Sequence, residues 1–243
     1  MTKDESSSAL LRRDIRPLDD PVGESLRGHH AHLARRFGRA LTYLPGVATF
    51  SAVEPDPDAR RWDDLVRLLG HDAFADMFSC PALPPSHWEP VFVLDGRQML
   101  YTGVGDSDEK QPEPDSAVVE LGAPDVPEML DLIERTRPGP FGPRTHELGT
   151  YLGVREGGVL VAMAGERLRP PGWTEISAVC TAPEARGRGH AAQLVNALIS
   201  RITSRGEGPF LHVAETNTAA ISLYERLGFR TRKNVIFRGF KTP

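Results

Sequence analysis

Apolar and polar residues alternate along residues 173–181, which read WTEISAVCT, and this alternation is typical of a β-strand with one buried face. Pro183 lacks a backbone N–H and therefore ends the predicted strand. Farther on, residues 190–202 carry apolar side chains at the spacing of one helix face: Leu194, Val195, Leu198, Ile199 and Ile202. The pattern predicts a strand and a helix joined by a short turn.

The turn between this strand and this helix is rich in glycine. Its residues are Arg186, Gly187, Arg188, Gly189, His190 and Ala191. Small residues let a ligand approach the backbone closely, and the first turn of a helix presents free N–H groups and the positive end of the helix dipole. Such a turn favours an anion, and a pyrophosphate in particular, although glycine-rich turns also serve ordinary connections.

The rest of the second half shows regular patterns on both sides of this turn. The hydrophobic pattern predicts strands at 117–121, 150–155, 159–168 and 209–216, and helices at 126–136 and 218–227. Asn217 and Gly228 are suited to cap the last helix at its two ends. Residues 137–145, RPGPFGPRT, contain three prolines and two glycines and predict a loop of fixed shape.

The first half predicts a mixed α/β structure. Residues 24–39 and 58–69 have helical patterns, and residues 47–53 are predicted to be extended. A β-hairpin is predicted over residues 90–104, with its turn at Asp95 and Gly96. No glycine-rich turn like that of the second half occurs in this part of the sequence.

Three histidines in the first predicted helix, His29, His30 and His32, suggest a metal site at first sight. Histidines three residues apart on a helix can share a metal ion, but no carboxylate or cysteine nearby completes the set of ligands. We interpret these histidines as a solvated helix face and predict no metal.

Residues 105–116, GDSDEKQPEPDS, are acidic, contain two prolines and lack large apolar side chains, so they predict a linker. The sequence is therefore divided into an N-terminal α/β domain at 1–104, this linker, and a C-terminal domain at 117–243. Acidic side chains outnumber basic ones before residue 117, and basic ones are in excess after it. A ligand with several phosphates would favour the second domain.

The chain has 243 residues and a net charge of −4, which provides neither a basic footprint for nucleic acid nor a polybasic membrane patch. No apolar run has the length of a signal peptide or a membrane helix, so we expect a cytoplasmic protein. Cys80 and Cys180 are the two cysteines, and we interpret both as core residues. The expected partner is a small molecule or a protein.

Two motifs in the second half resemble the acetyl-CoA-dependent N-acetyltransferase superfamily GNAT, and within it the FR47-like family. Arg186-x-x-Gly189-x-Ala191 is similar to the superfamily's pyrophosphate loop. About 30 residues later, the run from Asn217 through Tyr224 to Gly228-Phe229 is similar to its closing motif. Either motif alone occurs by chance, whereas both in this order rarely do. The resemblance covers roughly residues 117–243.

The resemblance implies a mixed, mostly antiparallel twisted sheet flanked by helices in the second half. It also implies acetyl-CoA as co-substrate and direct transfer of an acetyl group to an amine of a small molecule or a peptide. Some FR47-like proteins resemble a pair of such folds with the first copy degenerate. The first half is therefore expected to be a smaller or degenerate GNAT-like domain that shapes the acceptor site or a homodimer interface.

The same resemblance assigns roles along the predicted central strand. A bulge that widens the gap beside this strand would expose backbone groups of Val179, Cys180 and Thr181 to the pantetheine arm of the cofactor. Glu175, on the same strand, is the candidate general base, with Glu166 and His212 as weaker rivals. The alternative for Glu175 is a solvent-facing strand residue.

Tyr224 lies where the closing motif places the acid that protonates the departing CoA thiolate, although a core tyrosine is the alternative. Asn217 would both cap its helix and bind the cofactor. In the resembled fold, the loop after the first helix borders the acceptor pocket, so Phe141 and Arg144 are candidates for binding the acceptor. A packed surface loop is the alternative.

The favoured hypothesis is an acetyl-CoA-dependent N-acetyltransferase. A catalytically inactive acyl-CoA-binding module that acts through its N-terminal half stays open as the second hypothesis. A dinucleotide-binding oxidoreductase is disfavoured, because the glycine-rich turn comes late in the chain and lacks the flanking βαβ unit with an acidic ribose ligand. The sequence does not identify the acceptor amine.

Overall fold

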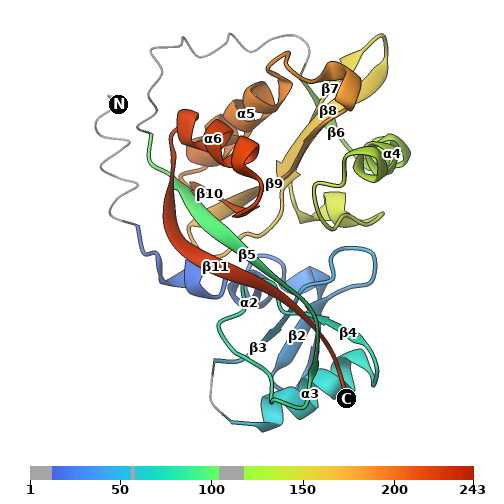
Figure 1. Ribbon diagram of the computed structural model, residues 1–243, viewed down its shortest axis with the longest axis vertical. Coiled ribbons are helices and arrows are strands. Elements are labelled where there is room, and N and C mark those ends of the chain that lie inside the picture. Colours follow the sequence, from blue (N-terminus) through green and yellow to red (C-terminus); the bar gives the residue numbers. More distant parts are fainter. Residues whose placement is uncertain (1–12, 56–57, 104–117) are drawn as a thin grey trace.

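A computed structural model describes residues 13–55, 58–103 and 118–243, which form a mixed α/β structure with two sheets (Figure 1). The smaller sheet has the order β1-β2-β3, and the larger has the order β4-β11-β5-β10-β9-β8-β7-β6. All strand pairs are antiparallel except β9 with β10. The mixed, mostly antiparallel sheet flanked by helices is thus confirmed. Within the described ranges, no helix has both the length and the apolar character needed to cross a membrane.

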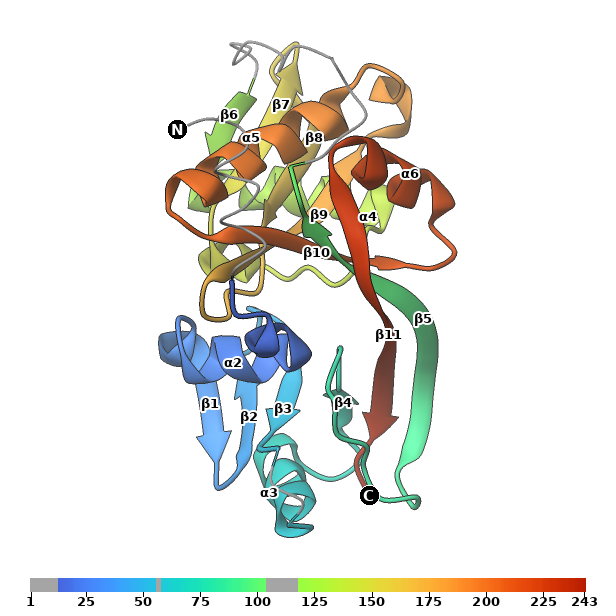
Figure 2. The same ribbon diagram turned by 90° about the vertical axis from the view of Figure 1, so that its left-hand side faces the viewer.

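The smaller sheet and its helices occupy the lower part of the molecule in Figure 2. Its elements are the 3-10 helices η1 (Arg16–Asp19) and η2 (Ala31–Leu33), the helices α2 (Pro21–Arg27) and α3 (Arg60–Leu69), and the strands β1 (Ala34–Phe37), β2 (Ala40–Tyr43) and β3 (Ser51–Val53).

The single helix predicted over residues 24–39 is wrong. Helix α2 ends at Arg27, where the N–H of Gly28 donates to the carbonyls of Glu24 and Ser25 and closes the last turn. His30 is buried, with its ring 2.9 Å from the Tyr43 hydroxyl and 3.1 Å from the Leu148 carbonyl, so it is not part of a solvated helix face. The chain then enters β1 and pairs with β2 instead of continuing as a helix.

The larger sheet is built from both halves of the chain. Its strands are β4 (Phe74–Asp76), β5 (Glu89–Tyr101), β6 (Val118–Leu121), β7 (Tyr151–Glu156), β8 (Val159–Glu166), β9 (Trp173–Thr181), β10 (Gly208–Ala214) and β11 (Phe229–Lys241). Its helices are η3 (Ala123–Asp125), α4 (Val126–Thr136), η4 (Thr145–Leu148), η5 (Pro183–Ala185), α5 (His190–Ser204) and α6 (Thr218–Arg226). Figure 1 shows α4 on one side of the strands β6 to β9 and α5 on the other. The apolar stripe predicted for α5 is buried against these strands.

The predicted hairpin over residues 90–104 is also wrong, because β5 is one continuous strand. Gly96 lies in its middle, opposite Ala214 of β10 and Val235 of β11. An added Cβ at Gly96 would lie 2.4 Å from the Phe237 ring and 2.8 Å from the Val213 carbonyl oxygen. Glycine is needed here for close packing between three strands rather than for a turn.

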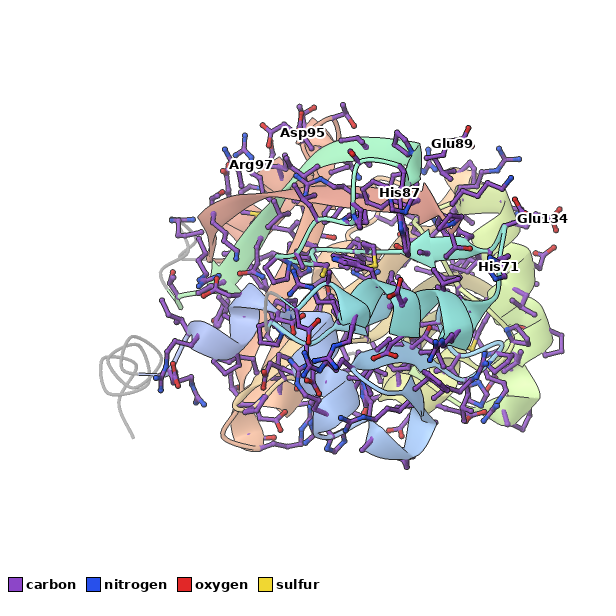
Figure 3. The ribbon with its side chains drawn as sticks, turned by 90° about the horizontal axis from the view of Figure 1, so that it is seen from below. His71, His87, Glu89, Asp95, Arg97 and Glu134 are labelled. Atoms are coloured by element: carbon purple, nitrogen blue, oxygen red, sulfur yellow. The ribbon has the colours of Figure 1, made fainter. Side chains whose placement is uncertain are left out.

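Strands β5 and β11 extend from beside β10 down to the lower end of the molecule, beside β4 (Figure 2). β5 comes from residues 1–104 yet is hydrogen-bonded between β10 and β11 of the second half. Figure 3 shows Glu89 near one end of β5, with Asp95 and Arg97 farther along the outer surface. The sheet therefore crosses the predicted domain boundary. The linker at 105–116 lies outside the described residues, so independent folding of the halves stays a prediction.

A buried ion pair lies where β9 meets β10. Arg167 donates from Nε and Nη2 to the two carboxylate oxygens of Glu175, both at 2.7 Å. His212 of β10 donates from Nδ1 to the same carboxylate at 2.6 Å. Burial alone would raise the pKa of Glu175, but Arg167 and His212 outweigh it and hold this pKa at about 2. Glu175 is thus a fully buried carboxylate anion.

Gly96→Ala should lower the free energy of unfolding by about 1–3 kcal/mol, because the added methyl overlaps a ring and a backbone carbonyl. Gly122→Ala is the matched control, since its new Cβ would meet only Pro124 at 3.7 Å and should change stability by no more than about 0.5 kcal/mol. Urea unfolding of both variants measures the difference. Equal stability of Gly96→Ala and the wild type would contradict the close packing of β5.

Glu175→Gln should destabilise the protein at pH 7 by about 3 kcal/mol or more, because it leaves the buried Arg167 cation without its carboxylate. The folded-state pKa of Glu175 lies below its ordinary value, so its stabilising effect is complete above about pH 4.5 and is lost as the pH falls towards about 2. The gap between wild type and variant should narrow over that range in urea titrations. Glu134→Gln, on the outer surface of α4 (Figure 3), is the control and should match the wild type at pH 7.

Candidate active site

Strands β9 and β10 separate halfway along the sheet. They pair only from Gly208 to Phe210 of β10, opposite Trp173 to Glu175 of β9. On its other side, β9 contains a bulge: Ala178 and Val179 lie between Ser177 and Cys180, the successive residues of β9 that pair with β8. Ala178 has a φ of +52°. This left-handed conformation is costly for alanine and bends the strand. The predicted gap beside the central strand is therefore confirmed.

A cavity of about 740 Å³ extends along the separated part of β9. Its walls are formed by β9, β10, the first turn of α5, α6 and the loop 138–140, together with residues of the first half. The residues that the two strands contribute are Ile176, Ser177, Ala178, Val179, Cys180, Thr181, His212, Val213 and Ala214. Val179, Cys180 and Thr181, the predicted contacts of the cofactor arm, are among them.

The glycine-rich turn borders the same cavity. Gly187 and Gly189 have φ values of +77° and +83°, and a Cβ added at either position would meet no atom within 4 Å. Gly189 directly precedes α5, whose first residue, His190, also lines the cavity. Free N–H groups at the start of a 15-residue helix thus face open space of the kind that a pyrophosphate needs.

The charged side chains of this turn differ in position. Arg186 lines the cavity and donates to the Thr181 carbonyl at 3.3 Å. Arg188 is not among the lining residues, because its guanidinium pairs with Glu156 and with the Glu184 carbonyl. Glu156 also holds the His190 ring at 3.0 Å. Arg186 is therefore the arginine of the turn that faces the ligand space.

Tyr224 and Asn217, the two residues of the closing motif, both line the cavity. Asn217 accepts from the N–H of Ala220 at 3.2 Å, which confirms the predicted helix cap. Tyr224 is 8% exposed and packs edge-on against Phe229. Burial raises the pKa of the Tyr224 phenol to about 12, so the phenol keeps its proton at neutral pH.

The three candidates for the general base all form hydrogen bonds or ion pairs with other side chains. Glu175 does not line the cavity, and its carboxylate is held by Arg167 and His212. His212 lines the cavity, but Gln98 donates to its Nε2, so both of its ring nitrogens are engaged. Glu166 pairs with Arg205 outside the cavity. The prediction that Glu175 acts as a base therefore lacks support, because a carboxylate with a pKa of about 2 is a weak proton acceptor.

The predicted acceptor residues Phe141 and Arg144 also lie outside the cavity lining. Phe141 packs edge-on against Tyr151, and Arg144 pairs with Glu147 at 2.7 Å on the surface. Their loop does reach the cavity, but through residues 138–140. The loop thus borders the cavity, whereas the side chains of Phe141 and Arg144 contact other partners, and its role at the acceptor stays a prediction.

Sequence reasoning missed the residues that the first half and the last strand bring to the cavity. These residues are Phe50, Asp76, Phe78, Phe92, Leu94 and Phe237. Local periodicity could not identify them, because they reach the cavity only through contacts between segments that are far apart in the sequence. Asp76, for example, ends a three-residue strand that pairs with β11, far away in the sequence.

Part of the second half is similar to known proteins. A family model described as FR47-like protein matches residues 151–237. The N-alpha-acetyltransferase RimI of Mycobacterium tuberculosis is 37% identical over 83 residues, or 33% of this chain, and the match spans about half (51%) of that protein.

Solved structures extend the similarity to the whole chain. A protein from Novosphingobium aromaticivorans, assigned to the GNAT family of acetyltransferases, has a TM-score of 0.82 and 38% identity over 94% of this chain and 99% of its own. A GCN5-related N-acetyltransferase from Kribbella flavida has a TM-score of 0.57 and 16% identity over 91% of this chain and 94% of its own, which shows the shared fold. Since the first of these similarities spans both halves and the cavity carries both sequence motifs, the chain belongs to the GNAT family of acetyltransferases.

Proposed function

We propose that this protein transfers the acetyl group of acetyl-CoA directly to a primary amine of a small molecule or peptide in the cytoplasm. The observation that carries this proposal is one cavity that joins the glycine-rich turn, the separated strands β9 and β10, and Tyr224. GNAT acetyltransferases use acetyl-CoA as co-substrate. The relative from Mycobacterium tuberculosis bears the name of an N-alpha-acetyltransferase, which fits an amine as acceptor.

The turn and the bulged strand are suited to different parts of acetyl-CoA. The N–H groups from Gly187 to Ala191 would hold the pyrophosphate, with Arg186 as the nearby cation. Val179 to Thr181 do not pair with β10, so their backbone groups on that side would form hydrogen bonds with the amides of the pantetheine arm. Bound acetyl-CoA supplies an acetyl group activated as a thioester.

Tyr224 then has the chemistry of a general acid. Its buried phenol stays neutral and lines the cavity, so it can protonate a departing thiolate. Glu175 has a different role in this proposal: its ion pair with Arg167 fixes the wall of the cavity from behind. The proton acceptor for the amine must therefore come from elsewhere on the cavity wall.

Gly189→Glu should abolish acetyl-CoA binding, because it adds bulk and negative charge at the proposed pyrophosphate site. Gly172→Glu is the matched control, because Gly172 is exposed, has a similar φ of +77° and has open space around a new Cβ. Gly172 directly precedes the first residue of β9, whereas the glycine-rich turn follows the last. Isothermal calorimetry with acetyl-CoA should show binding by the control alone. Unchanged affinity in folded Gly189→Glu would contradict the assignment.

Tyr224→Phe should lower kcat by at least about 100-fold while acetyl-CoA affinity and the thermal midpoint hardly change, since only the proton donor is removed. Tyr151→Phe is the control, because the Tyr151 hydroxyl is buried, has no hydrogen-bond partner within the described residues and does not line the cavity. Release of free CoA thiol measures turnover. Wild-type turnover in Tyr224→Phe would favour the inactive binding module or another acid.

A further inference from the structure

One part of the cavity wall is aromatic and comes mainly from the first half of the chain. We call it the aromatic chamber, defined by Phe50, Phe78, Phe92, Phe237 and Asp76. Phe78 stacks on Phe50 and on Phe237, with ring centroids 4.7 Å and 4.5 Å apart. These contacts give the chamber a rigid apolar surface.

The chamber and the glycine-rich turn lie at different levels of β9. Arg167, which bonds Glu175, lies over the rings of Phe50 and Phe78 and so marks the level of the chamber. The turn follows Thr181, and the strand from Glu175 to Thr181 spans roughly 20 Å. A ligand whose phosphates lie at the turn would therefore extend towards the chamber along the separated strands.

Asp76 is held firmly in the chamber wall. Its backbone pairs with Gly239 of β11 and forms a bridge with Phe50, so it lies where the smaller sheet meets the larger. The Thr49 hydroxyl donates to Oδ2 at 2.5 Å. The other oxygen, Oδ1, is buried without a hydrogen-bond partner among the described residues, although the side chain lines the cavity. A buried carboxylate oxygen without a donor is costly, so a ligand that supplies a donor at this oxygen would gain binding energy.

The charges around Asp76 favour a cation as that ligand. Asp76 is the sole carboxylate among the described residues that line the cavity. The nearest cation, Arg167, is already neutralised by Glu175. Burial raises the pKa of the Asp76 carboxyl, although the Thr49 hydroxyl, the charge of Arg167 and the backbone N–H of Phe78 oppose this effect. Asp76 is therefore a better proton acceptor than Glu175 and is placed on the cavity wall, where Glu175 is not.

We propose that Asp76 binds the ammonium group of the acceptor through Oδ1 and takes its proton, and that the acceptor is a primary amine on an aromatic or other apolar body. This inference rests on the acetyltransferase function proposed above and names its acceptor class. The phenyl rings of the chamber provide the apolar surface for the body of the amine.

The ammonium group gives one proton to Asp76 Oδ1, and the freed lone pair forms a C–N bond to the thioester carbon. The C–S bond breaks, and the thiolate takes the phenolic proton of Tyr224. The nitrogen of the new C–N bond then loses one more proton, which passes through solvent and restores the Tyr224 phenol. Asp76 releases the proton that it took from the ammonium group to solvent. The products are the acetylated amine, CoA thiol and one proton.

The test uses the full chain, with 2-phenylethylamine as the amine and 2-phenylethanol as its uncharged analogue. Asp76→Asn keeps the shape of the side chain and removes its charge. Asp95→Asn is the matched control, because it removes one charge from the exposed surface of β5 outside the cavity (Figure 3). Calorimetry on CoA-saturated protein measures binding of both compounds, and release of CoA thiol from acetyl-CoA measures turnover.

Wild type and Asp95→Asn should bind the amine at least about tenfold more tightly than the alcohol. Asp76→Asn should lose this preference and at least about 100-fold in kcat/KM, with acetyl-CoA affinity unchanged. Wild-type protein that binds the amine no more tightly than the alcohol would overturn the inference, whether or not Asp76→Asn folds.

The two proposals fail in different ways. Acetylation of the amine that is equally fast in wild type and Asp76→Asn would overturn the role of Asp76 and leave the acetyltransferase supported. Binding of the amine that depends on Asp76, without any acetylation by the wild type, would support the ammonium site and contradict the proposed transfer reaction.

Discussion

The separation of β9 from β10 is the constraint on which the site depends. The two strands pair only as far as Glu175 and Phe210, and the bulge at Ala178 bends β9 away beyond that point. The ion pair between Arg167 and Glu175, joined by His212, holds the strands together where they begin to separate. A buried charge pair thus fixes the start of the cavity, and a left-handed alanine keeps the cavity open along its length.

The first half of the chain contributes strands to the larger sheet and residues to the cavity wall. β5 fills the sheet between β10 and β11, while β4 places Asp76 against the cavity, and both strands come from before residue 104. Without them, β10 would have an unpaired edge, β11 would lose both of its partner strands, and the aromatic chamber would lose Asp76 and Phe92. The glycine-rich turn belongs to the second half, so the two ends of the cavity have separate origins in the sequence.

The sequence could predict those features that depend on residues close together along the chain. The strand over residues 173–181, the open turn before α5 and the cap at Asn217 depend on local periodicity and backbone conformation, and the structure confirms them. Burial does not follow the alternation of the sequence, because the first four residues of this strand are all buried. The sequence did not reveal the long-range partners: Arg167 forms an ion pair with Glu175, and the Phe237 ring packs against Gly96, which lies within a strand instead of a turn. Asp76 gave no local signal, because its importance arises only where distant strands meet.

The most direct test of this account is a crystal structure of the protein with CoA. The account predicts the pyrophosphate within hydrogen-bond distance of the N–H groups from Gly187 to Ala191, and the pantetheine arm between β9 and β10. The thiol should point along the cavity towards Tyr224 and the aromatic chamber. CoA bound outside this cavity, or β9 and β10 paired along their whole length with CoA elsewhere, would contradict it.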